Sequence, residues 1–248
     1  AQLGKYSVHP NPMVGCVLVS NASVVGEGWH ERAGEPHAEI IALQAAGDKA
    51  KGATAYVSLE PCAHQGKTPP CAEALIEAGI SRVVAAMEDP FDEVKGRGHE
   101  MLRDAGNEVQ VGLMQDVAEA LNEGFISRVT QGRPLVRLKI AASIDGATAM
   151  ESGESQWITG PEARQDVQKL RARSGAIMTG VGTVLVDDPS LNVRDDGIDT
   201  RGVQPLRVVL DSRLRMPSNA AMLALPGDTL VCYTGDHDGS GLEEAGAV

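Results

Sequence analysis

Residues 34–46 read GEPHAEIIALQAA, and this stretch decides how the first half of the chain is organised. Pro36 and the acidic Glu39 are typical of a helix start, and the apolar residues that follow recur at helical spacing. We therefore expect a helix over residues 38–46. Side chains two positions apart do not share a face in the middle of a helix. His37 and Glu39, however, lie at the start of this helix, where both side chains can point into one cavity.

Two cysteines further along the chain are candidate ligands that would bind a metal ion together with His37. Cys62 follows a predicted strand, and Cys71 opens a predicted helix over residues 72–78, where the helix N-terminus favours a thiolate. One imidazole and two thiolates suit zinc and leave a fourth tetrahedral position for water, which ionises near neutral pH and becomes a nucleophile. Glu39 is then placed to move protons.

The spacing of these residues leaves alternatives open. Zinc deaminases combine a His-x-Glu element with a Pro-Cys-x-x-Cys element. The first element fits, but eight residues separate Cys62 from Cys71. A lone histidine or cysteine is more often a core or surface residue than a ligand. A purely structural zinc site would have four protein ligands, with His64 as the fourth, and would leave Glu39 without a role.

Composition narrows the class of protein. The chain has 248 residues with 42% hydrophobic residues, enough for two domains. Its net charge of -12 and its 3% aromatic content disfavour nucleic-acid binding. Four cysteines are too few for a disulfide framework, so we expect reduced thiols and a cytoplasmic protein. We expect no membrane partner, because no apolar run approaches the roughly 20 residues that span a bilayer.

Strand and helix signals alternate along the rest of the chain. Valine-rich runs on either side of Asn21 predict a β-hairpin, and Gly180-Val181-Gly182 reads as a glycine-rich turn. This alternation predicts an α/β class throughout. The predicted strands cover residues 14–20, 24–29, 53–59, 82–87, 108–113, 135–140, 176–179, 206–211 and 229–233. The further predicted helices cover residues 94–105, 117–128 and 162–173, and residues 195–203 and 236–241 read as surface loops.

A polar stretch, Thr130-Gln131-Gly132-Arg133-Pro134, marks the predicted domain boundary. We therefore expect two α/β domains, residues 1–131 and residues 132–248. The second half lacks the Gly-x-Gly-x-x-Gly fingerprint after a strand, so nothing in its composition alone indicates a nicotinamide cofactor.

The motifs of both halves closely resemble the bifunctional deaminase/reductase family of riboflavin biosynthesis. The wide spacing of the two cysteines is itself typical of this family, and the resemblance extends to about Tyr233. The first half carries it in HPNPMVG (9–15), GEPHAE (34–39) and PCAHQGKTPPC (61–71). The second half carries it in LKIAASIDG (138–146), SGESQWIT (152–159) and GTVLVDDP (182–189).

This resemblance implies a fold and an activity for each half. Residues 1–131 would form a cytidine-deaminase-like three-layer α/β/α domain with zinc. Its substrate would be 2,5-diamino-6-ribosylamino-4(3H)-pyrimidinone 5′-phosphate, in which water replaces the ring 2-amino group and ammonia leaves. Residues 132–248 would form a dihydrofolate-reductase-like α/β domain that reduces the ribosyl side chain to ribityl with NADPH.

The resemblance also implies roles for residues of the first half. His37, Cys62 and Cys71 would hold the zinc, and Glu39 would be catalytic. The family commonly has Asp-Pro-Asn-Pro where this chain has Asp89-Pro90-Phe91-Asp92, so the family's asparagine has no counterpart here. Lys67 suits a phosphate because it is a compact cation on a flexible stem, although it could equally be a solvated loop lysine. Contacts to the pyrimidine nucleotide are implied for Asn11, His64, Lys67, Thr68 and Asp89.

In the second half the same match implies cofactor, substrate and catalytic residues. Two arginines suit a phosphate because the guanidinium is planar and always charged. Without the resemblance, Arg171 would be read as helix-surface charge and Arg194 as loop charge. Lys139 and Asp187 are expected near the hydride-transfer centre. Residues expected along NADPH are Ala141, Trp157, Thr183, Asp187 and Ser212, and those expected at the ribosyl phosphate are Ser155, Arg171, Leu191 and Arg194.

Three further expectations concern the extent of the chain and its partners. Reductase domains of this family usually continue well beyond the point where this chain stops, so we expect the C-terminal part of the second domain to be missing. The chain begins with Ala1 and not with Met, which indicates a start inside a longer sequence. We expect a homo-oligomer that acts on a small phosphorylated pyrimidine.

Two rival functions share part of this pattern. A nucleic-acid base deaminase of the tRNA or cytidine type has the same His-x-Glu chemistry, but it would want a basic groove and aromatic stacking. A non-enzymatic, zinc-stabilised scaffold would bind the metal with no open position.

Overall fold

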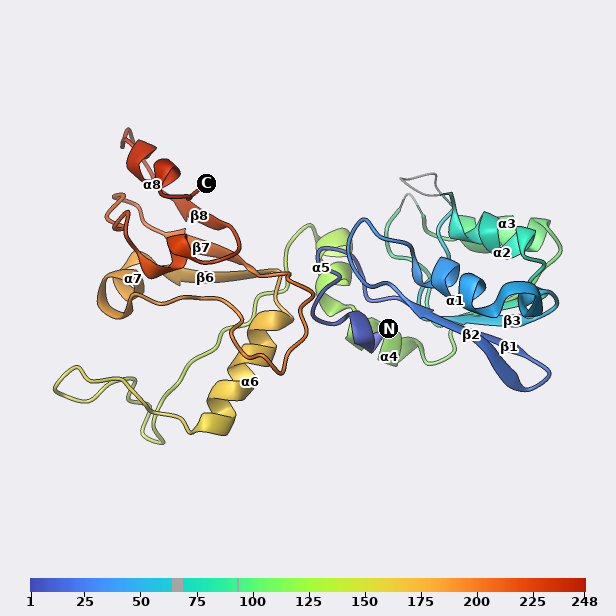
Figure 1. The fold of residues 1–248 in the computed structure, drawn as a ribbon, viewed down its shortest axis with the longest axis horizontal. Coiled ribbons are helices and arrows are strands. Elements are labelled where there is room, and N and C mark those ends of the chain that lie inside the picture. The colour runs from blue at the N-terminus through green and yellow to red at the C-terminus, as the bar shows by residue number, and fades with distance from the viewer. Residues whose placement is uncertain (64–68, 93) are drawn as a thin grey trace. The chain divides into compact units, whose positions relative to one another are not determined.

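The computed structural model describes residues 1–63, 69–92 and 94–248 of the chain. It divides into two compact units, Ala1–Arg137 and Leu138–Val248, each with its own sheet (Figure 1). Both units combine strands with helices, which confirms the α/β class. Within the described ranges, no helix has the length and apolar character needed to cross a membrane. The assignment of residues 1–131 and 132–248 to two activities stays a prediction.

A five-stranded sheet forms the centre of the first unit. Its strands are β1 (Gly15–Ser20), β2 (Ser23–Trp29), β3 (Thr54–Val57), β4 (Arg82–Ala85) and β5 (Glu108–Val111). The strand order is β2-β1-β3-β4-β5. β1 pairs antiparallel with β2 and β3, while β3, β4 and β5 run parallel. The hairpin between β1 and β2 turns at Asn21 and Ala22, as the sequence predicts.

Three helices cover one face of this sheet and close its main core. They are α1 (Ala38–Ala46), α2 (Cys71–Glu77) and α3 (Arg97–Asp104). Small alanines on α1 and β3 and larger residues such as Leu18 and Leu75 fill the space between helices and sheet. Two short 3-10 helices, η1 (Gln2–Gly4) and η2 (Gly47–Ala50), flank these elements.

Glycines on β2 let α1 approach the sheet closely. A Cβ atom at Gly28 would overlap the carbonyl oxygen of Ala38, and one at Gly26 would overlap that of Ala42. The backbone of α1 therefore lies directly against β2, which leaves no room for a side chain between them. This close packing sets the position of the start of α1, where His37 and Glu39 lie.

The expectation of one helix over residues 117–128 is wrong, because two helices occupy this region. They are α4 (Gln115–Leu121) and α5 (Glu123–Gln131), separated at Asn122. The Asn122 side chain turns to the backbone of Met13, with Oδ1 accepting from its N–H at 2.8 Å and Nδ2 donating to its carbonyl at 3.1 Å. Such a side-chain to backbone pairing competes with helix continuation.

A three-stranded parallel sheet forms the centre of the second unit. Its strands are β6 (Ala176–Gly180), β7 (Leu206–Leu210) and β8 (Thr229–Cys232), in the order β6-β7-β8. Its helices are α6 (Pro161–Ala172), α7 (Val181–Asp187), η3 (Ala221–Ala224) and α8 (Ser240–Glu244). The core includes Val209, Met222 and Val231.

Two expectations for this unit are wrong. Gly180-Val181-Gly182 is the start of α7 and not a simple turn. The expected loop over residues 236–241 contains the start of α8, at Ser240.

The strand expected over residues 135–140 is wrong. This segment carries no strand in the described structure, although its apolar residues alternate as in a strand. Val136, Leu138 and Ile140 are 81%, 85% and 63% exposed. Alternation predicts a strand only when a neighbouring strand accepts its hydrogen bonds, and none in the described ranges pairs with this segment.

Candidate functional site

His37 and the two cysteines reach one point from three different elements. His37 is the N-cap residue of α1, with extended backbone angles that turn its side chain away from the helix. Cys62 follows β3 and Pro61, and Cys71 is the first residue of α2. The N–H of Cys71 donates to the Cys62 sulfur at 3.3 Å, and the N–H of Ala72 donates to the Cys62 carbonyl at 3.1 Å. The start of α2 therefore holds Cys62 in place.

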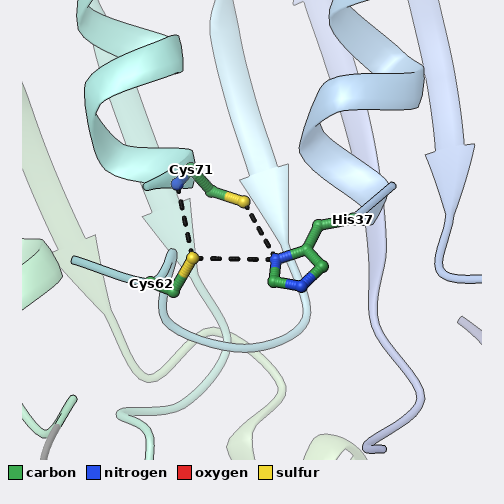
Figure 2. A group of neighbouring side chains, drawn as sticks. All are labelled: His37, Cys62 and Cys71. Atoms are coloured by element: carbon green, nitrogen blue, oxygen red, sulfur yellow. Dashed lines mark hydrogen bonds between the residues drawn. The ribbon is translucent and has the colours of Figure 1, made fainter. Parts of the chain in front are cut away.

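The three donor atoms lie within 4.8 Å of one another (Figure 2). His37 Nδ1 is 3.2 Å from the Cys71 sulfur and 3.6 Å from the Cys62 sulfur. Tetrahedral zinc bonded to sulfur and imidazole nitrogen at its usual distances would separate the nitrogen from each sulfur by about 3.5 Å. The spacing of these side chains is thus close to that of a zinc site, to which they would supply three ligands.

The protonation states of the metal-free donors follow from their mutual hydrogen bonds. The pKa of Cys62 is lowered to about 4, chiefly because the Cys71 thiol donates to its sulfur. The same hydrogen bond, together with burial, raises the pKa of the Cys71 thiol. The hydrogen bond to Cys62 also raises the pKa of His37. One thiolate, one thiol and one imidazole therefore face each other, and a cation can displace the shared proton.

Glu39 lies beside these donors in the first turn of α1. The residue is 3% exposed, and burial raises the pKa of its carboxyl group to about 7. Its Oε2 atom has no hydrogen-bond partner among the described residues. Interactions of Glu39 with Cys62, His37 and Cys71 all contribute to its pKa, so the carboxyl group lies close to all three donors.

Asn11 is linked to His37 by His30, a histidine that the sequence patterns did not single out. His30 is 3% exposed, with Nδ1 3.1 Å from the carbonyl of Pro36 and Nε2 2.9 Å from Asn11 Nδ2. A carbonyl can only accept, so Nδ1 carries the proton and Nε2 accepts from the Asn11 amide. The His30 ring also meets the His37 ring edge-on at 5.4 Å. Asn11 is therefore linked through His30 to the donor set.

Asp89 follows β4 and is 8% exposed. Its Oδ1 accepts from the N–H of Phe91 at 2.9 Å, which turns the carboxylate towards its own loop. The N–H of Asp89 donates at 3.1 Å to Oε2 of Glu60, a buried carboxylate that the sequence analysis also missed. The implied substrate residues His64, Lys67 and Thr68 lie outside the described residues.

In the second unit the structure brings together three of the four residues implied for the ribosyl phosphate. Arg171, near the end of α6, donates from Nη1 to the carbonyl of Asn192 at 2.9 Å. Burial and the nearby Arg194 lower the pKa of Arg171. Leu191 is 8% exposed and belongs to the core of the unit, so its side chain serves packing. Ser155 lies on an exposed segment, and no described contact joins it to the other three.

The residues implied for NADPH fall into two groups. Thr183 and Asp187 lie on α7, which follows β6, and Ser212 follows β7. Because β6 and β7 are parallel neighbours, Thr183 and Ser212 stand at the same edge of the sheet, beyond the carboxyl ends of the strands. Ala141 and Trp157 lie between residues 138 and 160, as does Lys139. Trp157 is 67% exposed, with the Arg164 guanidinium 4.5 Å from its ring centroid.

His30 and Glu60 gave only weak signals in the sequence. A single histidine after a strand is usually a core or surface residue. An acidic residue between an apolar strand and Pro61-Cys62 was the one hint at Glu60. Both act through hydrogen bonds to backbone or side-chain groups many residues away, which local sequence patterns do not reveal.

Comparison with protein families identifies both units. Residues 1–87 match the cytidine and deoxycytidylate deaminase zinc-binding region, and residues 134–245 match the RibD C-terminal domain. The riboflavin biosynthesis protein RibD of Escherichia coli K12 is 55% identical over 243 residues, which cover 94% of this chain and 66% of that protein. The chain thus spans less than two thirds of the length of this curated relative.

Two solved structures share the fold. RibD of Acinetobacter baumannii has a TM-score of 0.93 and 51% identity, with 100% of this chain and 69% of that chain covered. A diaminohydroxyphosphoribosylaminopyrimidine deaminase/5-amino-6-(5-phosphoribosylamino)uracil reductase from Thermotoga maritima has a TM-score of 0.87 and 38% identity. That comparison covers 95% of this chain and 67% of the other.

Proposed function

Because the chain belongs to the RibD family of riboflavin biosynthesis proteins, we propose that it is a bifunctional enzyme with a zinc deaminase and an NADPH-dependent reductase. The first unit hydrolyses 2,5-diamino-6-ribosylamino-4(3H)-pyrimidinone 5′-phosphate at its ring 2-amino group. The second unit then reduces the ribosyl side chain of the product to ribityl. The single observation that carries the deaminase is the meeting of His37, Cys62 and Cys71 beside the buried Glu39.

His37, Cys62 and Cys71 hold the zinc, which when bound polarises water and so supplies a nucleophile near neutral pH. Glu39 accepts a proton from the attacking water. It passes that proton to the adjacent ring nitrogen and then carries the remaining hydroxyl proton to the amino nitrogen, which leaves as ammonia while the ring carbon keeps the oxygen as a carbonyl. A carboxyl group whose pKa is about 7 can both take up and release a proton at neutral pH.

Asn11 and Asp89 bind and orient the pyrimidine in this scheme. The His30 nitrogen accepts from Asn11 Nδ2, which leaves the amide oxygen of Asn11 able to meet a ring N–H or amino group. His64, Lys67 and Thr68 are proposed as further contacts to the nucleotide, with Lys67 at its phosphate.

For the reductase we propose that Arg171 and Arg194 bind the ribosyl phosphate. Two neighbouring guanidinium groups repel each other unless an anion lies between them, and the lowered pKa of Arg171 reflects first its burial and then the proximity of Arg194. Lys139 and Asp187 lie near the hydride-transfer centre. The NADPH contacts are Ala141, Trp157, Thr183, Asp187 and Ser212, and the further substrate contacts are Ser155 and Leu191.

We also propose a cytoplasmic homo-oligomer that acts on a small molecule and not on nucleic acid or at a membrane. The net charge of -12 supports the exclusion of nucleic acid, because a phosphate backbone would be repelled. The cysteines support a reducing compartment, since none of the four forms a disulfide.

The deciding experiment combines metal analysis with an ammonia-release assay on the pyrimidine nucleotide. We expect one zinc per chain and ammonia release, followed by NADPH oxidation when the cofactor is added. Ammonia release from RNA, with none from the nucleotide, would favour a nucleic-acid base deaminase. A protein that binds zinc but releases no ammonia from either substrate would be a zinc-stabilised scaffold.

A further inference from the structure

Glu60 is a buried carboxylate whose two oxygens are shared among four backbone N–H groups. The residue is 3% exposed. Its Oε2 accepts from Asp89 at 3.1 Å and from Gly96 at 3.0 Å. Its Oε1 accepts from Gly98 at 2.9 Å and from His99 at 3.3 Å. Four hydrogen bonds from backbone N–H groups to one carboxylate side chain make a strong, directional anchor.

Three of these donors belong to the start of α3. Gly96 is the N-cap residue of that helix, and Gly98 and His99 lie in its first turn. The first N–H groups of a helix have no partner within the helix, and the helix dipole favours a negative charge there. The N-cap residue itself provides no side-chain cap. Glu60 therefore caps α3 from a distant part of the chain.

Pro61 and Cys62 form the ligand loop, and the same helix start touches its backbone at Pro61. A Cβ atom at Gly98 would overlap the carbonyl oxygen of Pro61, so α3 begins directly against the residue that precedes Cys62. Glu60, next to the ligand loop in the chain, is thus hydrogen-bonded both to the start of α3 and to Asp89, which follows β4.

We propose that Glu60 is a positioning residue of the deaminase site, whose carboxylate binds Asp89 and the start of α3 to the backbone before Cys62 and so sets where Cys62 and Asp89 stand. The effect expected on substrate binding, through Asp89, rests on the proposed function. The effect expected on zinc binding does not, because it concerns Cys62, which lies two residues after Glu60.

Two other roles for Glu60 fit the contacts less well. Glu60, Glu88 and His99 could approach a single metal ion, since one ligand atom of each lies within 4.8 Å of the others. Four N–H groups point at the Glu60 oxygens, however, and their positive ends oppose a cation there. An ion pair with His99 is also weak, because burial lowers the His99 pKa and its Nδ1 lies 3.7 Å from Glu60 Oε2.

Substitutions in the zinc-loaded, two-unit chain test the proposal. Glu60→Gln keeps the size of the side chain but turns an NH₂ group towards two of the N–H donors, whereas Glu60→Asp keeps the charge with a shorter reach. Glu88→Gln is the matched control, because it removes a carboxylate from the same group while no hydrogen bond to Glu88 is recorded in the described ranges. The readouts are zinc affinity by chelator competition, the thiolate-to-cobalt absorption of the Co²⁺-loaded protein, and KM and kcat for ammonia release.

We expect Glu60→Gln to weaken zinc binding by about 10- to 100-fold, the usual effect of losing a group that orients a ligand. Its cobalt absorption should shift because Cys62 moves, and its KM should rise by more than kcat falls because Asp89 moves. Glu60→Asp should recover part of each change. Glu88→Gln should behave like the wild type.

Several outcomes would overturn the proposal. Wild-type zinc affinity, cobalt absorption and KM in Glu60→Gln, with only a lower melting temperature, would make Glu60 a structural cap. Loss of a second equivalent of zinc in Glu88→Gln would make the group a metal site. If Glu60→Gln does not fold, Glu60→Asp is judged by the same readouts. If the wild type releases no ammonia, the proposed function fails, and the zinc and cobalt readouts still decide this proposal.

Discussion

The carboxyl group of Glu39 is almost fully buried, and burial raises its pKa to about 7. A side chain with this pKa exchanges protons readily at neutral pH, whereas an exposed glutamate would remain ionised. Its Oε2 atom has no hydrogen-bond partner among the described residues, and the carboxyl group lies close to the three donors, where it would be able to take up a proton from an attacking water. The proton chemistry of the proposed deaminase therefore depends on this one residue.

Replacing Glu39 with glutamine separates proton transfer from metal binding. We expect Glu39→Gln to retain one zinc per chain, because Glu39 is not one of the three donors. Its kcat for ammonia release should fall by about 10²- to 10⁴-fold, the usual contribution of general acid–base catalysis. Zinc content and initial rates measured on the same sample check both expectations. Full activity in this variant would remove Glu39 from the mechanism.

The raised pKa of Glu39 also makes a prediction for the metal-free protein. The ordinary pKa of 4.5 applies to the unfolded chain, while the folded protein holds the proton up to about pH 7. Between these values the folded state binds more protons, so the contribution of Glu39 to stability falls as pH rises. Relative to Glu39→Gln, the wild type should lose roughly 3 kcal/mol between pH 4.5 and 7.

Urea unfolding of both metal-free proteins at several pH values measures this difference. The cysteines and His37 titrate in both proteins, so their effects largely cancel in the comparison. Stability curves that run parallel from pH 4.5 to 7 would show that burial does not hold a proton on Glu39.

The meeting of His37, Cys62 and Cys71 could be predicted from the sequence, whereas the residues that hold them in place could not. His37, Glu39, Cys62 and Cys71 stand at helix starts and after a strand, where local patterns are informative. His30 accepts a hydrogen bond from Asn11, which lies 19 residues away in the sequence. Glu60 acts through backbone groups 29 to 39 residues away. Only the folded chain reveals such pairs.

His37 and Glu39 lie at the start of helix α1, and the place of this helix depends on the glycines of β2. We expect Gly28→Ala to destabilise the protein by about 1–3 kcal/mol, because the added methyl group would push α1 away from the sheet. The displaced helix start should also weaken zinc binding. Thermal unfolding and chelator competition measure the two effects.

Gly124→Ala is the matched control for this substitution. A Cβ atom at Gly124 would meet no atom within 4 Å, and alanine favours a helix such as α5. This variant should be as stable as the wild type or slightly more stable. Equal stability of Gly28→Ala and the wild type would show that α1 does not depend on close contact with β2.

Helices and strands could be predicted where neighbouring residues determine them, and could not be predicted where they depend on a residue far away in the sequence. The helix over residues 38–46 and the hairpin at Asn21 follow from spacing and turn residues alone. The helix break at Asn122 depends on Met13, which lies 109 residues away. The expected strand over residues 135–140 has the right alternation but no paired neighbour in the described structure.

The two units have separate cores, so metal binding in the first should leave the stability of the second unchanged. We expect removal of zinc to lower the unfolding temperature of the first unit and to abolish ammonia release. At free zinc 100 times above Kd, the lost stabilisation is about 3 kcal/mol. Differential scanning calorimetry with and without a chelator measures the shift.

Cys62→Ser provides the control for that experiment. Its calorimetric profile should not respond to the chelator, because it has lost a zinc ligand. An equal shift in both transitions of the wild type would contradict independent units, and no shift at all would contradict a metal bound by the folded first unit.

X-ray absorption at the zinc edge tests the metal centre most directly. We predict two sulfur neighbours at about 2.3 Å, one imidazole nitrogen at about 2.0–2.1 Å, and one further light atom from solvent. Cys62→Ser should lose one of the sulfurs. A second imidazole in place of the solvent atom, or a shell with fewer than two sulfurs, would contradict a site built from His37, Cys62 and Cys71 with room for water.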